Sequence, residues 1–142
     1  MLIGNTDAHG KNISFYWDVQ GLRLAPAYDL VCVPALATDQ LSDTYAMAIG
    51  DAFSEGDLSA FEWANFARQC GLPARMVSEQ LQQLSRRVLD TLEDVVVEVI
   101  AAGVEREVAE TIAAKVKLTC DHQIDIAPNI LKIRRSDFER QT

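Results

Sequence analysis

The stretch Gly4-Asn5-Thr6-Asp7-Ala8-His9-Gly10-Lys11-Asn12, near the start of a 142-residue chain, decides how the fold can be read. A second polar stretch, Ala27-Tyr28-Asp29-Leu30, follows after a short interval. Carboxylates, amides, an imidazole and an amine grouped in this way are typical of proteins that transfer phosphoryl groups. The residues between the two stretches determine whether these groups can meet.

The intervening residues predict a β-hairpin. The segments Ile13-Ser14-Phe15-Tyr16-Trp17 and Leu22-Arg23-Leu24 place their side chains alternately on two faces, as strands do. We expect Gln20-Gly21 to form a two-residue turn, because Gly adopts a positive φ without strain. Pro26 must lie at an edge or a bulge of the second strand, so a one-residue shift of the register stays open.

In this register Asn12 lies opposite Asp29. Directly opposed residues of an antiparallel pair have Cβ atoms roughly 4.5–5.5 Å apart, so an amide oxygen and a carboxylate would converge at the open end of the hairpin. Mg²⁺ prefers one or two protein oxygen ligands, with water and substrate phosphates completing its shell. The sequence therefore predicts a Mg²⁺ site formed by Asn12 and Asp29.

Asp7 is close enough in the chain to share this site. Its carboxylate can accept the proton of an attacking hydroxyl group. An Asp, an Asn after four intervening residues, and a second Asp after a hairpin follow the order of protein-kinase catalytic loops, where they act as base and metal ligands. The usual His-Arg-Asp is replaced by Asn5-Thr6-Asp7, however, and Asp-Phe-Gly by Asp29-Leu30-Val31.

These departures resemble one family. The motif at residues 5–12, the segment Leu24-Ala25-Pro26-Ala27-Tyr28-Asp29-Leu30 and the segment Tyr45-Ala46-Met47-Ala48-Ile49-Gly50 resemble the carboxy-terminal part of HipA-like serine/threonine kinases. Those kinases are the toxins of bacterial toxin–antitoxin pairs. The resemblance implies a mostly α fold: the helical carboxy-terminal lobe of a protein-kinase-like fold, with one short β-hairpin near the N-terminus.

The resemblance also implies ATP and Mg²⁺ as cofactors and a role for each polar residue. Asp7 would be the catalytic base, and Asn12 and Asp29 would be the metal ligands. The nucleotide would be contacted by His9, Lys11, Asn12, Tyr28 and Asp29. Of these, His9 and Lys11 would contact phosphates or brace the loop, and Tyr28 would flank the nucleotide.

The partners that the resemblance implies are a protein substrate and an antitoxin of HipB type, or the amino-terminal half of the kinase. The helix that holds Arg68 corresponds to a region that can approach operator DNA. A net charge of −8 argues against a general nucleic-acid binder, so we expect DNA contact only indirectly, through the antitoxin. Self-association is a further expectation for under-covered apolar faces.

Composition predicts an ordinary globular protein. Hydrophobic residues make up 49% and charged residues 24% of the chain, which suits a packed core. We find no signal peptide and no run of 18 apolar residues, and we expect a cytoplasmic protein. Three widely spaced cysteines fit no disulfide or zinc framework, and Cys120-Asp121-His122 lacks further ligands, so reduced thiols are expected.

We read the whole chain, residues 1–142, as a partial kinase-like lobe in four segments. Residues 1–30 carry the catalytic loop, the hairpin and the metal-binding Asp; residues 31–56 are irregular; residues 57–131 form a helical bundle; residues 132–142 form a loosely packed tail. By analogy with activation segments, a serine or threonine of the irregular segment could be a phosphosite. The candidates are Thr38, Ser42, Thr44 and Ser54.

Three helices are expected in the bundle. The first begins with Asp57 as its N-cap and ends at Gly71. The second begins at Pro73 and runs to Gly103, and the third runs from near Glu105 to near Pro128, antiparallel to the second. Their apolar stripes are Val77, Leu81, Leu84, Val88, Leu92, Val95 and Val99 in the second helix, and Val108, Ile112, Val116, Cys120 and Ile124 in the third. A coiled-coil dimer is the alternative use of such stripes.

Three functions are compatible with these features. The first is the carboxy-terminal fragment of a HipA-like kinase, expected to be inactive alone because the glycine-rich loop and strand lysine are absent and Met1 directly precedes the catalytic loop. The second is a non-catalytic module that binds a partner through exposed apolar surfaces such as Phe15 and Trp17. The third is a small-molecule phosphotransferase, although such enzymes more often carry His-Gly-Asp. A plain polar turn would leave Asp29 unexplained.

Overall fold

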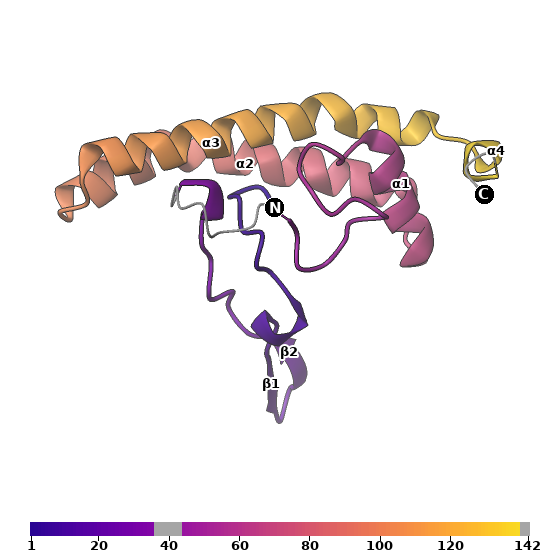
Figure 1. The fold of residues 1–142 in the computed structure, drawn as a ribbon. Helices are drawn as coiled ribbons and strands as arrows, with labels where there is room; N and C mark the ends of the chain where they lie inside the picture. Colours follow the sequence, from indigo (N-terminus) through magenta and orange to yellow (C-terminus); the bar gives the residue numbers. More distant parts are fainter. Residues whose placement is uncertain (36–43, 140–142) are drawn as a thin grey trace.

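A computed structural model describes residues 1–35 and 44–139 of the chain. Two long helices lie side by side, a shorter helix packs at one end of the pair, and a small hairpin projects away from them (Figure 1). The elements in chain order are η1 (Gly10–Asn12), β1 (Phe15–Asp18), β2 (Gly21–Leu24), η2 (Val33–Ala35), α1 (Ala60–Gln69), α2 (Ala74–Ala101), α3 (Arg106–Ile126), η3 (Ala127–Lys132) and α4 (Arg135–Phe138). This confirms the predicted fold class of a helical lobe with one short hairpin.

The long helices α2 and α3 form the predicted antiparallel pair. They are joined at Gly103, whose φ of +100° is a conformation that favours glycine. Ser78 Oγ on α2 donates a buried hydrogen bond of 2.8 Å to the Ala127 carbonyl at the end of α3, which lets the helices approach closely. Along α2 the buried residues are Val77, Ser78, Leu81 and Ser85.

The predicted stripe of α2 is wrong in two places. Leu84 is 52% exposed and Val95 is 47% exposed, whereas Ser85 is fully buried. The line of contact with α3 passes through Ser78, Leu81 and Ser85, so Leu84 lies to one side of it. Small hydroxyl side chains occupy the seam where the sequence pattern favoured larger apolar residues.

Helix α1 begins later than the sequence predicts. Its N-cap is Ser59, whose Oγ accepts a 3.4 Å hydrogen bond from the Glu62 backbone N–H. Asp57 is not the cap, because its carboxylate accepts a 2.6 Å hydrogen bond from Ser54 Oγ in the turn before the helix. At the other end Gly71, with a φ of +65°, stops the helix as expected. Small shifts of this kind also place Pro73 at the N-cap of α2 and begin α3 at Arg106.

The hairpin exists, but its predicted register is wrong. The paired residues are Phe15 with Leu24, Tyr16 with Arg23, Trp17 with Leu22 and Asp18 with Gly21. The turn therefore consists of Val19 and Gln20 instead of Gln20 and Gly21. The cause is the Asp18 side chain, whose Oδ1 accepts a 2.8 Å hydrogen bond from the Gln20 N–H and closes the turn one residue early.

The core joins the amino-terminal loop to the helices. Leu2, Tyr45 and Trp63 belong to one buried cluster together with residues of α2, α3 and η3. Within it, the Trp63 indole N–H donates a 2.8 Å hydrogen bond to Gln123 Oε1 on α3, so a buried polar atom has a partner. This cluster fixes the loop that carries the candidate site against the helical layer. Within the described residues, no helix is long and apolar enough to cross a membrane.

The predicted loosely packed tail, residues 132–142, is packed at Phe138, whereas Lys132, Arg134, Arg135, Ser136 and Glu139 are exposed. The α4 residue Phe138 packs its ring against Phe61 of α1 at a centroid distance of 4.9 Å. The guanidinium carbon of Arg68 lies 5.1 Å from the centroid of the same ring. Phe138 therefore packs on α1 through Phe61 and Arg68, which the charged composition of the tail did not indicate.

The irregular segment is irregular wherever it is described, apart from η2 and a bridge between Ile49 and Ala52. Of the candidate phosphosites, Thr38 and Ser42 lie outside the described residues. Thr44 is exposed, and Ser54 is half-buried and bonded to Asp57. All three cysteines are free, and Cys120 is fully buried while His122 is exposed, so these two do not form a shared surface site.

Candidate functional site

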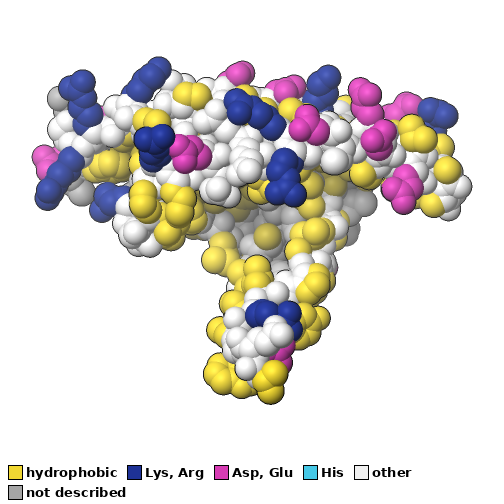
Figure 2. Space-filling model, turned by 180° about the vertical axis from the view of Figure 1, so that it is seen from behind, with side chains coloured by type: hydrophobic (Ala, Val, Ile, Leu, Met, Phe, Trp, Pro, Cys, Tyr) yellow, Lys and Arg dark blue, Asp and Glu magenta, His cyan; other side chains and the backbone are white. Residues whose placement is uncertain are grey.

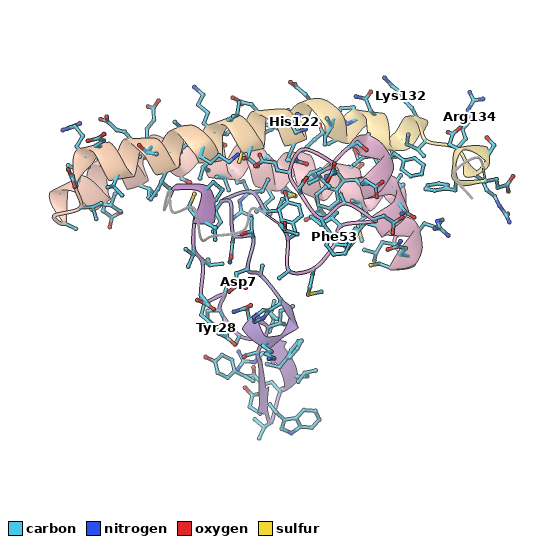
Figure 3. All side chains as sticks on the ribbon, viewed as in Figure 1. Asp7, Tyr28, Phe53, His122, Lys132 and Arg134 are labelled. Carbon is cyan, nitrogen blue, oxygen red and sulfur yellow. The ribbon has the colours of Figure 1, made fainter. Side chains whose placement is uncertain are left out.

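The polar loop lies where the hairpin meets the helical layer. Figure 3 shows Asp7 and Tyr28 in the segments that connect the hairpin to the helices. The backbone of the loop is held by neighbouring segments: the Gly4 carbonyl accepts a 3.1 Å hydrogen bond from the Val33 N–H, and the Thr6 carbonyl accepts one of 2.8 Å from the Ala46 N–H. These bonds fix the first residues of the loop and leave Asp7 and the residues after it facing solvent.

Asn12 and Asp29 meet, as the sequence predicted, although they are not opposed in the strand ladder. Asn12 Nδ2 donates a 2.7 Å hydrogen bond to Asp29 Oδ2. Asn12 Oδ1 accepts one of 2.9 Å from the His9 backbone N–H. The short helix η1 ends at Asn12, before β1 begins, and it brings the Asn12 amide to the Asp29 carboxylate beyond the end of the strand pairing.

Asp29 has an unusual backbone. Its φ of +58° is the only positive value at a non-glycine position among residues 1–35 and 44–139. This left-handed conformation costs an L-residue about 1–2 kcal/mol. Asn5 compensates for it, because its Nδ2 donates a 3.0 Å hydrogen bond to the Asp29 backbone carbonyl. This role of Asn5 was not predicted from the sequence, because a hydrogen bond from a side chain to a backbone atom 24 residues away produces no recognisable sequence pattern.

The Tyr28 side chain connects the segment after β2 to the polar loop. Its hydroxyl group donates a 2.8 Å hydrogen bond to the Lys11 carbonyl and lies 3.0 Å from Ser14 Oγ. Its side chain is 46% exposed, so one part of the ring is available to a ligand. The position suits the flanking role expected of Tyr28, and the hydroxyl adds a bracing role that the sequence did not reveal.

Of the remaining predicted residues, His9 lines a pocket of about 380 Å³, whereas Asp7 and Lys11 are not part of its wall. The Asp7 carboxylate beside it is exposed and has no hydrogen-bond partner within the described part of the chain. His9 Nδ1 is buried and likewise has no partner there, while Lys11 is exposed. Polar and apolar residues share the wall: Asn5, Thr6, His9, Asn12, Tyr28, Leu30, Tyr45, Met47, Ile49 and Phe66.

A larger groove of about 720 Å³ lies elsewhere, between the first residues of the chain, α1 and α2. Its wall is mostly apolar and includes Leu72, Met76 and Leu84. Neither wall includes Asp7 or Asp29. The smaller pocket is the better candidate for chemistry, because Asn5, His9 and Asn12 line it and Asn12 is bonded to the Asp29 carboxylate.

The Asn12 and Asp29 side chains fit a Mg²⁺ ion by the chemistry of their donors. A carboxylate and an amide are hard oxygen ligands, and their partial exposure leaves room for water and phosphate oxygens. The Asn12 amide now presents its nitrogen to Asp29. An ion between the two side chains would have to replace this hydrogen bond. Clusters of three or more His, Cys, Asp or Glu with metal-site geometry are absent from the described residues.

Glu55, Lys115 and Thr119 form a polar cluster between α3 and the segment that holds the loop. The Glu55 carboxylate accepts hydrogen bonds of 2.6 Å from Lys115 Nζ and 2.7 Å from Thr119 Oγ1, both on α3. Burial raises the pKa of Glu55, but these two donors outweigh burial and hold the pKa below its ordinary value. Burial and the nearby Glu55 charge raise the pKa of Tyr45 to about 12. The cluster anchors residues 45–55 to α3, and Ala46 in turn holds Thr6.

The helical layer, the hairpin and the order of loop residues define the class as the carboxy-terminal lobe of a protein-kinase-like fold. The comparison with known proteins gives the family: the model of the HipA-like C-terminal domain matches residues 1–92. The chain belongs to this family, as the sequence motifs indicated.

Two curated relatives are similar to the chain. The serine/threonine-protein kinase toxin HipA of Shewanella oneidensis is 35% identical over 96 residues, which cover 68% of this chain and 22% of that protein. The putative kinase Y4mE of Sinorhizobium fredii is 33% identical over 122 residues, which cover 83% of this chain and 29% of that protein.

A solved structure is also similar. It is the complex of HipA, HipB and operator DNA of Shewanella oneidensis, with a TM-score of 0.77 and 28% identity over 94% of this chain and 31% of that chain. The chain therefore spans less than a third of the length of each of these relatives.

Proposed function

We propose that this chain is the carboxy-terminal part of a HipA-like serine/threonine protein kinase that transfers the γ-phosphoryl group of ATP to a protein hydroxyl group. The observation that carries the proposal is the meeting of Asn12 and Asp29, at 2.7 Å, in the loop that also contains Asp7. Family membership and the kinase names of the relatives support it.

Asp7 would be the catalytic base. Its exposed carboxylate would accept the proton of the substrate hydroxyl group while the hydroxyl oxygen bonds to the γ-phosphorus atom. The bond from that phosphorus to the oxygen shared with the β-phosphate breaks, and ADP leaves. General-base help of this kind contributes about 10²–10⁴ in rate. An exposed position suits a base that must meet a second protein.

Asn12 and Asp29 would hold Mg²⁺. When bound, the ion neutralises charge on the phosphate oxygens during transfer. His9 and Lys11 would contact the phosphates, and Tyr28 would flank the nucleotide. His9 Nδ1 lies buried in the pocket wall and has no hydrogen-bond partner among the described residues, which supports its part in this assignment, because a buried polar atom without a partner favours binding a ligand.

The proposed partners are a protein substrate and a HipB-type antitoxin. The similar structure contains HipA together with HipB and operator DNA, which supports the antitoxin. For this chain we propose contact with DNA only through the antitoxin, because the net charge is −8 and Arg68 is already engaged with Asn65 and Phe138.

Transfer of radiolabelled phosphate tests the proposal, with the amino-terminal kinase half supplied. The Asp7→Asn variant should lose transfer to protein while folding normally, because the exchange is nearly isosteric and the side chain is exposed. Asp29→Ala should weaken Mg²⁺-ATP binding. Asp90→Asn on the exposed surface of α2 is the matched control and should behave like wild type. Full transfer by Asp7→Asn, or labelling of a small molecule instead of protein, would contradict the proposal.

A second candidate function, a partner-binding module, is favoured by the hairpin. Trp17 is 81% exposed and Leu24 is 67% exposed. Figure 2 shows apolar side chains gathered on the projecting hairpin. Exposed apolar surface of this kind usually marks a site of protein contact. A Trp17→Ser variant should then bind the kinase half or antitoxin more weakly in calorimetry, and unchanged binding would count against this candidate.

A further inference from the structure

Asn5 is a buried residue of the loop to which neither the motif nor the proposed reaction gives a part. Its side chain is 6% exposed, and its Nδ2 donates to the carbonyl of Asp29, 24 residues further along the chain, at 3.0 Å. We propose that Asn5 is a positioning residue: it holds Asp29 in its left-handed backbone conformation and thereby directs the Asp29 carboxylate toward Asn12.

Asp29 needs such a restraint. Its φ of +58° lies in the left-handed region, which Asp adopts more readily than most L-residues but less often than negative φ, and a change to negative φ would redirect the side chain. Packing does not hold it, because Asp29 and its neighbours Tyr28 and Leu30 are all exposed. Within residues 1–35 and 44–139, two side-chain hydrogen bonds restrain it: Asn5 bonds to its backbone oxygen and Asn12 to its carboxylate.

Asn5 is able to act as the restraint because its own backbone is fixed on both sides. The Gly4 N–H donates to the Met1 carbonyl at 2.7 Å, and the Gly4 carbonyl accepts from Val33. On the other side the Thr6 carbonyl accepts from Ala46. Asn5 thus belongs to the part of the loop that is attached to the helical layer, whereas Asp29 follows the exposed strand β2. The hydrogen bond between them connects the two parts.

The importance of Asp29 as a metal ligand rests on the proposed function, but its backbone conformation does not. The two can therefore be tested separately on the labelled 142-residue chain by NMR. A positive φ brings the amide and α protons of a residue close together and gives a strong intraresidue NOE. We expect this signal for Asp29 in the wild type. We expect it to weaken in Asn5→Ala and in Asn5→Asp, which keeps the side-chain size and removes the donor.

Asn65→Ala is the matched control. Asn65 is also buried, at 2% exposure, and its Nδ2 donates to Asp51 Oδ2 at 2.7 Å. The variant loses a buried amide of the same kind without contacting Asp29, so the Asp29 signal should remain. If Asp29 keeps its strong NOE in both Asn5 variants, or loses it equally in Asn65→Ala, the positioning role is wrong.

Unfolding measurements give a second, independent readout. Glycine adopts a positive φ without strain, so Asn5→Ala should destabilise an Asp29→Gly background less than the wild type. Equal losses in the two backgrounds would overturn the proposal. This cycle remains informative when Asn5→Ala lowers stability too far for a complete NMR assignment.

Titration with Mn²⁺ separates the positioning role from the metal site. Wild type should show paramagnetic broadening at Asn12 and Asp29, and Asn5→Ala, which removes the donor without adding a charge, should bind Mn²⁺ about 5- to 30-fold more weakly, as expected when the left-handed conformation is no longer held. Absence of broadening in wild type would contradict the metal assignment and leave the NOE result to decide the role of Asn5. Equal Mn²⁺ affinity with an unchanged Asp29 NOE would contradict the positioning role alone.

Discussion

Replacement of Gly50 by alanine should be among the most damaging small substitutions in this chain. Gly50 is buried, has a φ of +63° and lies in the turn between Ile49 and Ala52. A Cβ atom there would come closer than 3.0 Å to both the backbone oxygen and the carboxylate of Glu62 on α1. The backbone oxygen cannot move without shifting α1, and moving the carboxylate would break its 2.6 Å hydrogen bond from the Asp51 N–H.

Two costs add in this variant. The left-handed conformation costs alanine about 1–2 kcal/mol, and overpacking against a helix costs about 1–3 kcal/mol more. The expected loss in the free energy of unfolding is therefore about 2–5 kcal/mol. At about 2–4 °C for each kcal/mol in a domain of this size, the Tm should fall by about 4–20 °C.

Thermal and urea unfolding, followed by circular dichroism, test this reasoning with two controls. Gly71 has nearly the same φ, +65°, but no atom within 4 Å of its added Cβ, so Gly71→Ala should show the conformational cost alone. Gly10 has neither a positive φ nor a neighbour, so Gly10→Ala should change little. If Gly50→Ala is no less stable than Gly71→Ala, the close approach of the turn to α1 is refuted.

Three further predictions concern the helical side of the molecule. Lys115→Met should lower the free energy of unfolding by about 1 kcal/mol at neutral pH, because the ion pair with Glu55 is only partly buried. The folded-state pKa of Glu55 is lowered, so the stability that its carboxylate contributes is present above its ordinary pKa of 4.5 and is lost as the pH falls below that value. Urea unfolding of the variant should therefore depend less on acid pH than that of the wild type. The pKa of Tyr45 is raised from 10.0 to about 12, so unfolding should become easier as the pH rises through this window, and Tyr45→Phe should reduce that dependence unless the tyrosine titrates normally in an absorbance titration. Phe138→Ala should lower stability by about 1–3 kcal/mol by removing the ring contact with Phe61, and an unchanged Tm would show that α4 does not pack on α1.

The helices could be predicted because their signals are local. Gly71, Pro73 and Gly103 mark the ends of α1 and α2 through their own backbone preferences. The hairpin could be predicted as an element, but not its turn, because the Asp18 side chain competes with the glycine for the turn position. A contact between Phe138 and Phe61 could not be foreseen, since periodicity within one helix does not show which distant residue will cover it.

The candidate site shows the same division. Asn12 and Asp29 could be brought together from spacing, because a hairpin of either register returns the chain to the same end. The predicted pairing of Asn12 with Asp29 across the strands was wrong, because their side chains make the contact outside the paired strands. Asn5 and the Glu55 cluster could not be found, because each acts through a partner far away in the chain or through a backbone atom.

The length of the α2 and α3 pair has a consequence for how the chain opens. Helix α2 has 28 residues and at 1.5 Å per residue extends about 42 Å, yet its buried residues all lie between Val77 and Ser85. In the half nearer Gly103, the residues of α2 are half-buried or exposed. Amide protons there should exchange with solvent through local fraying, whereas those around Leu81 should exchange only when the whole domain unfolds. The pair thus has a stability gradient along its axis, highest where it supports the loop of Asp7 and Asn12.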